Sequence, residues 1–232
     1  MSRTPILSRV RWTKTYRIIP SRFPPIDAFE RVIDPSRSVL LGDLEGLTNA
    51  RLRQEWGEIS LIPPERRVFG PGASWVMAPF AHFRGRPTRF SDGTYGVYYA
   101  GREIETAIAE TVHHMSLFYA ATSDAPHRED VRTLIGSIDA RLHDLRKGAW
   151  RRELDPDDYG AAQALGRRLR DAASPGIVYP SVRRAGGQAV AVFWPDVVGI
   201  PVQGPHFAYH WDGARIDKMF DYRKEAWTDV GA

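Results

Sequence analysis

The sequence contains no cysteine among its 232 residues. Disulfide bonds, thiolate zinc sites and a cysteine nucleophile are therefore excluded, and such a chain suits the reducing cytoplasm, where we expect it. No run of about 18 apolar residues is present, so we predict no transmembrane helix and no membrane partner. The first residues lack a long apolar stretch, and we predict no secretory signal.

The sequence also lacks the motifs of several large enzyme classes. It has no G-x-G-x-x-G, G-x-x-x-x-G-K or G-x-S-x-G pattern, so dinucleotide redox, P-loop and α/β-hydrolase chemistry lose their usual support. The adjacent His113 and His114 diverge by about 100° on a helix and cannot easily share a metal ion. We therefore predict no metal site.

Hydrophobic residues make up 43% of the chain, enough to bury one core, and nothing divides residues 1–232 into separate domains. The formal net charge is +4. Because the arginine clusters are interspersed with acidic residues, we expect solvated faces and no direct binding of nucleic acid. A non-catalytic module that binds nucleic acid or protein is the alternative. The clusters are Arg51-Leu52-Arg53, Arg66-Arg67, Arg84-Gly85-Arg86 and Arg167-Arg168-Leu169-Arg170.

Alternating strand and helix signals predict an α+β or mixed α/β fold, and we favour α+β. Period-two patterns indicate strands, 3.6-residue patterns indicate helices, and Asp212-Gly213 is typical of a hairpin turn. The expected elements are strands at 16–19 and 131–140, helices at 43–59 and 157–171 (the second capped by Asp155), and hairpin strands at 207–211 and 214–220.

One block joins a strand to a helix. Tyr95, Val97 and Tyr99 alternate with small or aromatic residues, which predicts a strand, and apolar residues follow helical spacing from Ile104. Glu110 falls about 100° from the centre of that apolar stripe. A carboxylate at the edge of the stripe can face a cleft while the helix packs on a sheet; a solvated helix residue is the alternative.

The chemistry of this block suits a nucleotide. Arginine, here Arg89, is suited to bidentate phosphate contacts. A tyrosine ring such as that of Tyr99 covers a flat heterocycle at low entropic cost. A carboxylate beside an anomeric carbon, as Glu110 would be, stabilises oxocarbenium character where positive charge develops.

A second block places a hydroxyl at the end of a strand. Ser174-Pro175-Gly176 predicts a turn, residues 177–179 a short buried strand, and Pro180 its end. Ser181 can therefore meet a ligand; a serine that bonds its own backbone is the alternative. The chain then turns into an apolar strand at 189–193.

The segments "RFSDG…GVYYAGREIETAIAET" and "PGIVYPSVRRAGGQAVAVF" resemble the RES-domain family, named for a dispersed Arg, Glu and Ser, and most nearly its ParT-like branch. The resemblance runs from about residue 89 to residue 194. A weaker anchor lies at Tyr16-Arg17-Ile18. Residues 20–88 are then an N-terminal extension of the core.

The resemblance assigns roles residue by residue. Glu110 and Ser181 match the family Glu and Ser, and Tyr99 matches a Tyr eleven residues before the Glu. Arg89 matches an Arg usually followed by Trp-Asn, whereas Phe90-Ser91 follows it here. Arg17 matches an early Arg. The family match implies catalytic roles for Glu110, Ser181 and Tyr99, and contacts to NAD from Arg17, Arg89, Tyr99 and Ser181.

The resemblance also implies a fold and a function. We expect an ADP-ribosyltransferase-like α+β fold, with small mixed sheets and an NAD cleft flanked by helices. We expect a bacterial toxin that cleaves NAD, as substrate, at the nicotinamide–ribose bond and transfers ADP-ribose to a protein acceptor; an NAD phosphorylase or glycohydrolase is the alternative. The expected partner is an Xre-like antitoxin.

Overall fold

The computed structural model describes residues 3–23, 27–30, 57–83 and 85–230. Long strands and two long helices dominate the described part of the chain. In chain order the elements are β1 (Leu7–Pro20), α1 (Asp27–Glu30), η1 (Ile59–Leu61), η2 (Pro64–Arg66), α4 (Ala73–Ala81), β2 (Tyr98–Gly101), α5 (Ile104–Thr122), β3 (His127–Asp144), α6 (Gly160–Asp171), β4 (Gly176–Pro180), β5 (Gln188–Val192), η3 (Pro195–Val197), β6 (Val198–Trp211), β7 (Ile216–Asp221) and β8 (Ala226–Asp229).

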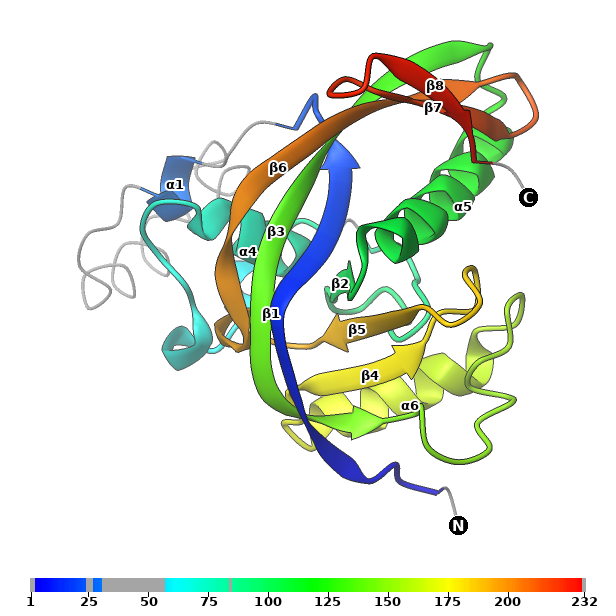
Figure 1. Cartoon of the computed structure of the whole chain (residues 1–232). Coiled ribbons are helices and arrows are strands. Elements are labelled where there is room, and N and C mark those ends of the chain that lie inside the picture. Colours follow the sequence, from blue (N-terminus) through cyan, green and yellow to red (C-terminus); the bar gives the residue numbers. More distant parts are fainter. Residues whose placement is uncertain (1–2, 24–26, 31–56, 84, 231–232) are drawn as a thin grey trace.

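The strands form one mixed sheet in the order β1-β2-β5-β4-β3-β6-β7-β8. β1 also pairs with β3 along most of its length, from Leu7 opposite His143 to Pro20 opposite Val131. This second pairing closes β1, β2, β5, β4 and β3 into a ring. β6 pairs with the earlier part of β3, on the edge opposite β1, and β7 and β8 continue the sheet from β6 (Figure 1). The ring brings β1, from the start of the chain, next to β2, so that Tyr16 lies opposite Gly101.

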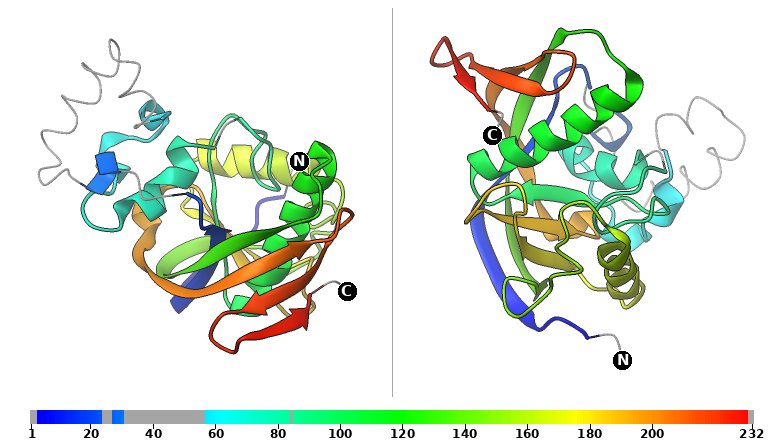
Figure 2. Two further views of the ribbon diagram at one scale, coloured as in Figure 1. Left: turned by 90° about the horizontal axis from the view of Figure 1, so that it is seen from above. Right: turned by 90° about the vertical axis from the view of Figure 1, so that its right-hand side faces the viewer.

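Two amphipathic helices cover the sheet. α5 contacts β1, β2 and β7, and Figure 2 shows it crossing the molecule between the β7–β8 hairpin and the strands β4 and β5. It buries Ala107, Val112 and Tyr119 against aromatic residues of β6. α6 buries Leu165 and Leu169 against β4 and β5. The face of α5 that does not pack in this core therefore borders the ring of strands.

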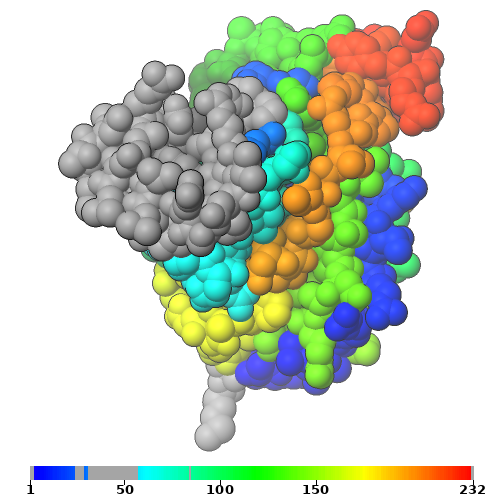
Figure 3. Space-filling model, turned by 90° about the vertical axis from the view of Figure 1, so that its left-hand side faces the viewer, coloured from blue at the N-terminus to red at the C-terminus, as the bar shows by residue number. Residues whose placement is uncertain are grey.

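The segment at 57–83, which holds α4, lies along β6 on another side of the molecule (Figure 3). Val76, Met77 and Phe80 of α4 are buried in a third apolar cluster with residues of β1, β3 and β5. No helix of the described ranges is long and apolar enough to cross a membrane.

The α+β class is confirmed. The strands had been expected as small mixed sheets. They are joined by hydrogen bonds into one sheet because the long β1 and β3 run past both groups of shorter strands. The hairpin around Asp212-Gly213 is also confirmed: Asp212 Oδ1 accepts hydrogen bonds from the backbone N–H of Ala214 and Arg215.

Several predicted boundaries were wrong. The first strand runs over fourteen residues, and the strand expected from Tyr95 begins at Tyr98, because residues 95–97 cross α4: a Cβ on Gly96 would lie 2.0 Å from the carbonyl oxygen of Pro79. α6 begins at Gly160, since Asp155 accepts bonds from Asp157 and Asp158 in a turn before the helix. Most of the helix expected at 43–59 lies outside the described residues.

Candidate active site

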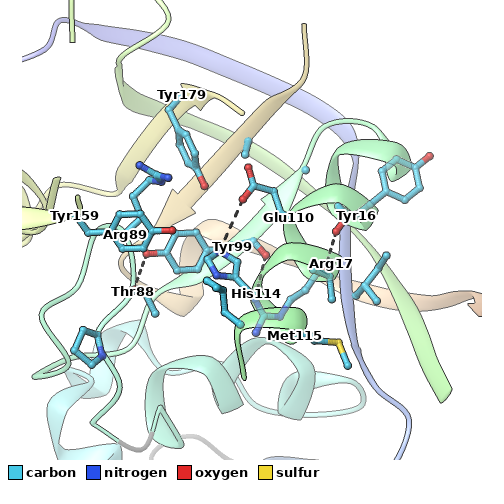
Figure 4. Close-up of a pocket in the computed structure, with 18 residues that line it drawn as sticks. Tyr16, Arg17, Thr88, Arg89, Tyr99, Glu110, His114, Met115, Tyr159 and Tyr179 are labelled. Carbon is cyan, nitrogen blue, oxygen red and sulfur yellow. Dashed lines mark hydrogen bonds and ion pairs between the residues drawn. The ribbon is translucent and has the colours of Figure 1, made fainter. Parts of the chain in front are cut away.

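A cavity of about 400 Å³ lies between α5 and the strands β1, β2, β4 and β5. Its volume is in the range of small-molecule sites. Figure 4 shows its side chains converging from elements far apart in the sequence. The residues that line it are Tyr16, Arg17, Ile18, Pro87, Thr88, Arg89, Tyr99, Ala100, Gly101, Ala107, Glu110, Thr111, His114, Met115, Leu117, Tyr159, Tyr179 and Ala189.

Glu110 supplies the carboxylate of the cavity. It lies in the second turn of α5, and its side chain is 19% exposed. Its Oε1 accepts a hydrogen bond of 2.6 Å from Ser181 Oγ. Its Oε2 lies 3.9 Å from Nε2 of His114, one helical turn later. One carboxylate oxygen is thus held by the protein, while the other remains next to the cavity.

Ser181 follows β4 and is held by its own turn. Besides donating to Glu110, its Oγ accepts hydrogen bonds from the backbone N–H of Arg183 (3.2 Å) and Arg184 (3.1 Å). Its own N–H donates to the carbonyl oxygen of Gly187 at 2.9 Å. The sequence offered either a ligand contact or a local backbone bond; the structure shows the backbone bonds together with the bond to Glu110. Ser181 does not itself line the cavity.

Arg89 lies in the loop before β2 and is only 4% exposed. Its Nη1 donates to the carbonyl oxygen of Asp155 at 2.6 Å, and its guanidinium lies 4.4 Å from the ring centroid of Tyr159. The segment before α6 therefore fixes the orientation of this guanidinium. A planar cation held in this way is preorganised to bind an anion in the cavity.

The ring of Tyr99, rather than its hydroxyl, is available to contact a ligand. The hydroxyl oxygen accepts a hydrogen bond of 3.0 Å from the N–H of Phe90 and lies 2.8 Å from Thr88 Oγ1. Burial raises the pKa of Tyr99 to about 12, so the hydroxyl stays protonated. These bonds tie β2 to the loop that carries Arg89.

Arg17 reaches the cavity from β1. Its Nη1 donates to the carbonyl oxygen of Tyr99 at 3.1 Å, and its guanidinium lies 4.9 Å from the ring centroid of Tyr98. Burial lowers the pKa of Arg17 from its ordinary value, although an arginine remains charged at neutral pH. Figure 4 shows Arg17 and Arg89 on opposite sides of Tyr99.

The cavity carries an excess of positive charge. Within the described ranges, neither Arg17 nor Arg89 forms an ion pair with a carboxylate, and neither does Arg183, which follows Ser181. A buried cation without an anionic partner is costly. Partial burial, with His113 and Arg183 nearby, lowers the pKa of His114 to about 4, so its ring is neutral at neutral pH. The site is therefore suited to an anionic ligand.

The structure brings together the residues that the sequence singled out. Arg17, Arg89, Tyr99 and Glu110 line one cavity, and Ser181 is bonded to the last of these. Other lining residues were missed, among them His114, Tyr179, Thr88 and Tyr159. His114 lies four positions after Glu110, and Tyr179 lies two positions before Ser181, so helical and strand periodicity were available signals for them. Nothing in the sequence distinguished Thr88 or Tyr159.

The arginine clusters do not form a free basic face in the described part of the chain. Arg66 pairs with Asp196, and Arg167 pairs with Asp92. Arg66 and Arg170 also lie over the ring of Trp194. Residues 51–53 and Arg84 lie outside the described residues. Among the described residues there is also no group of three or more side chains suited to hold a metal ion.

Comparisons with known proteins relate the chain to a family. The family model named RES domain matches residues 64–212. An uncharacterized protein, y4oC, of Sinorhizobium fredii (strain NBRC 101917 / NGR234) is 30% identical over 210 residues, which cover 89% of this chain and 86% of that protein. A chain from the M. tuberculosis MbcT–MbcA toxin–antitoxin complex aligns with a TM-score of 0.42 and 13% identity, over 89% of this chain and 88% of that one. Because the family match spans more than half of the chain, it shows that the chain belongs to the RES domain family.

Proposed function

We propose that the protein is an enzyme that cleaves NAD at the nicotinamide–ribose bond and transfers ADP-ribose to a protein acceptor. The observation that carries this proposal is the position of Glu110: its carboxylate is fixed by Ser181 at a cavity bordered by Arg17 and Arg89. A fixed carboxylate next to cationic groups without anionic partners fits a ligand that carries phosphates and develops positive charge on a sugar.

Each side chain takes a role that its surroundings allow. Arg89, with Arg17, binds the pyrophosphate, and the ring of Tyr99 stacks on the nicotinamide or its ribose. The bond between the ribose C1′ and the nicotinamide nitrogen breaks, and nicotinamide leaves as a neutral molecule with the bonding electrons. Oε2 of Glu110 stabilises the oxocarbenium ion at C1′. A nucleophile of the acceptor then bonds to C1′ and releases its proton.

The group that accepts ADP-ribose determines the class to which the enzyme belongs. Resemblance to the ParT-like branch supports transfer to a protein, whereas phosphate or water as acceptor would give ADP-ribose-1-phosphate or ADP-ribose. The same resemblance supports a role as the toxin of a toxin–antitoxin system, neutralised by an Xre-like antitoxin. The net charge of +4 suits an acidic segment of such a partner.

The test is to incubate the protein with NAD, with and without bacterial lysate, and to identify the products by mass spectrometry. Release of nicotinamide together with a protein that gains an ADP-ribose group supports the full proposal. Nicotinamide with ADP-ribose-1-phosphate or ADP-ribose, and no modified protein, assigns the reaction to phosphorolysis or hydrolysis. Intact NAD under all conditions overturns the proposal. The matched control is Glu110→Gln, which keeps the size of the side chain but removes its charge.

A further inference from the structure

Two hydroxyl groups, those of Tyr179 and Ser181, lie near the carboxylate of Glu110. Tyr179 is in β4, and Ser181 follows two residues later, just beyond the end of that strand. Figure 4 shows the hydroxyl of Tyr179 and the carboxylate of Glu110 directed toward one another. Tyr179 lines the cavity although it is only 3% exposed.

The hydrogen-bonding capacity of Ser181 is fully used within the protein. A serine hydroxyl donates one hydrogen bond and accepts two. Ser181 donates to Glu110 and accepts from the backbone N–H of Arg183 and Arg184. A ligand could reach this hydroxyl only by displacing one of these bonds. Ser181 is therefore equipped to hold the carboxylate, and not to bind a ligand.

The turn that carries Ser181 is itself fastened to α5. Gly187, at the end of the turn, approaches Thr106 so closely that a Cβ would lie 2.6 Å from Thr106 Oγ1. Thr106 is fully buried in the first turn of α5, and Nη1 of Arg184 lies 3.4 Å from its hydroxyl. These contacts hold the turn against the helix, and they therefore fix the position of Ser181 relative to Glu110.

The hydroxyl of Tyr179 is in the opposite situation. It forms no hydrogen bond within the described part of the chain, and the side chain, although almost completely buried, lines the cavity. Burial, reinforced by the nearby carboxylate of Glu110, raises the pKa of Tyr179 well above its ordinary value, so the group remains a neutral donor. Because Tyr179 lines the cavity, a ligand or water there can accept a hydrogen bond from this hydroxyl.

We propose that these two residues have different roles at Glu110. Tyr179 binds the ligand by donating a hydrogen bond to a ribose oxygen, and Ser181 is a positioning residue that orients the carboxylate. The ligand class rests on the proposed function, because a ribose next to the carboxylate is what that reaction requires. Tyr179 then contributes to affinity for NAD, whereas Ser181 contributes to turnover.

The experiment compares Tyr179→Phe and Ser181→Ala. Affinity for NAD is measured by calorimetry in the Glu110→Gln background, which prevents turnover, and kcat is measured from nicotinamide release in the otherwise unchanged protein. Tyr179→Phe should weaken NAD binding about fivefold, as for the loss of one neutral hydrogen bond. Ser181→Ala should leave NAD affinity within about twofold and lower kcat at least about tenfold, and Ser181→Thr, which keeps the hydroxyl, should recover most of the lost kcat.

Tyr209→Phe is the matched control. The hydroxyl of Tyr209 forms no hydrogen bond within the described ranges either, but Tyr209 packs in the core behind α5 and does not line the cavity. This variant should bind and cleave NAD like the wild type. Unchanged NAD affinity in Tyr179→Phe overturns the role of Tyr179, and a loss of affinity in Ser181→Ala equal to that in Tyr179→Phe overturns the division of roles.

The outcomes separate this inference from the proposed function. If the wild type releases no nicotinamide, the proposed function is wrong, and the role given to Ser181 is wrong with it. The role of Tyr179 is still decided in that case by NAD affinity in the Glu110→Gln background. Absence of NAD binding in that background overturns both the inference and the proposed ligand.

Discussion

Replacing Glu110 gives the sharpest test of the proposed chemistry. Its side chain is 19% exposed, so an effective dielectric constant of about 20 is appropriate for its interactions. A full negative charge about 4 Å from a developing positive charge is then worth ~4 kcal/mol. Because each 1.36 kcal/mol changes a rate tenfold, Glu110→Gln should slow nicotinamide release by about 10²–10³.

Two substitutions of Glu110 separate the effect of its charge on turnover from the effect of its hydrogen bond on stability. In Glu110→Gln the amide oxygen can still accept the hydrogen bond from Ser181 Oγ, so the folded state should keep its stability. In Glu110→Ala that donor loses its acceptor, and we expect a loss of about 1–2 kcal/mol in the free energy of unfolding. Both variants should be equally impaired in turnover if the charge is what matters.

The assay is single-turnover release of nicotinamide, followed by chromatography, with thermal unfolding measured on the same samples. Turnover near the wild-type rate in a folded Glu110→Gln protein would refute the assignment of Glu110 as the stabilising carboxylate. A rate in Glu110→Ala much lower than in Glu110→Gln would show instead that the hydrogen bond to Ser181, rather than the charge, carries the effect.

Three further predictions concern the surroundings of the site. Arg89→Ala should weaken NAD binding strongly, and Arg89→Lys should restore it only in part because an ammonium lacks the planar fork; equal affinity of all three proteins in calorimetry would contradict this. Expression of the wild type alone should stop bacterial growth, and an Xre-like antitoxin should restore it; normal growth with active protein accumulating would argue against a toxin. Because the pKa of His114 falls from 6.5 to about 4 on folding, the unfolded chain binds the extra proton between these values. Stability should therefore decrease as the pH falls from 6.5 to 4, and less so in His114→Asn, as measured by thermal unfolding.

Local patterns predicted much of the site. The change from strand to helical periodicity placed α5 and put Glu110 at the edge of its apolar stripe, and both features depend only on neighbouring residues. The turn and strand before Ser181 were predicted for the same reason. Such signals are local, so they are already present before any tertiary contact forms.

Contacts between distant segments could not be predicted in this way. The bond from Ser181 to Glu110 joins residues 71 positions apart, and the carbonyl that holds Arg89 belongs to a turn 66 positions later. The long pairing of β1 with β3 was also missed, because the polar residues of an exposed strand face do not reveal its length. Propensity likewise failed at 95–97, where packing against α4 decides the conformation.

The closed ring of strands explains why cavity residues that are far apart in the sequence lie close together in fixed positions. β1 brings Arg17 to β2, and its bond to the carbonyl of Tyr99 ties the first strand to the middle of the chain. Tyr99 in turn holds the loop of Arg89 through Phe90, and the turn after β4 holds Glu110. Every charged group of the cavity is thus fixed by a neighbour that uses backbone atoms or a neutral hydroxyl, not by an opposite charge. Such an arrangement keeps the guanidinium groups oriented while it leaves their charge uncompensated, which favours an anionic ligand at the cost of stability in its absence.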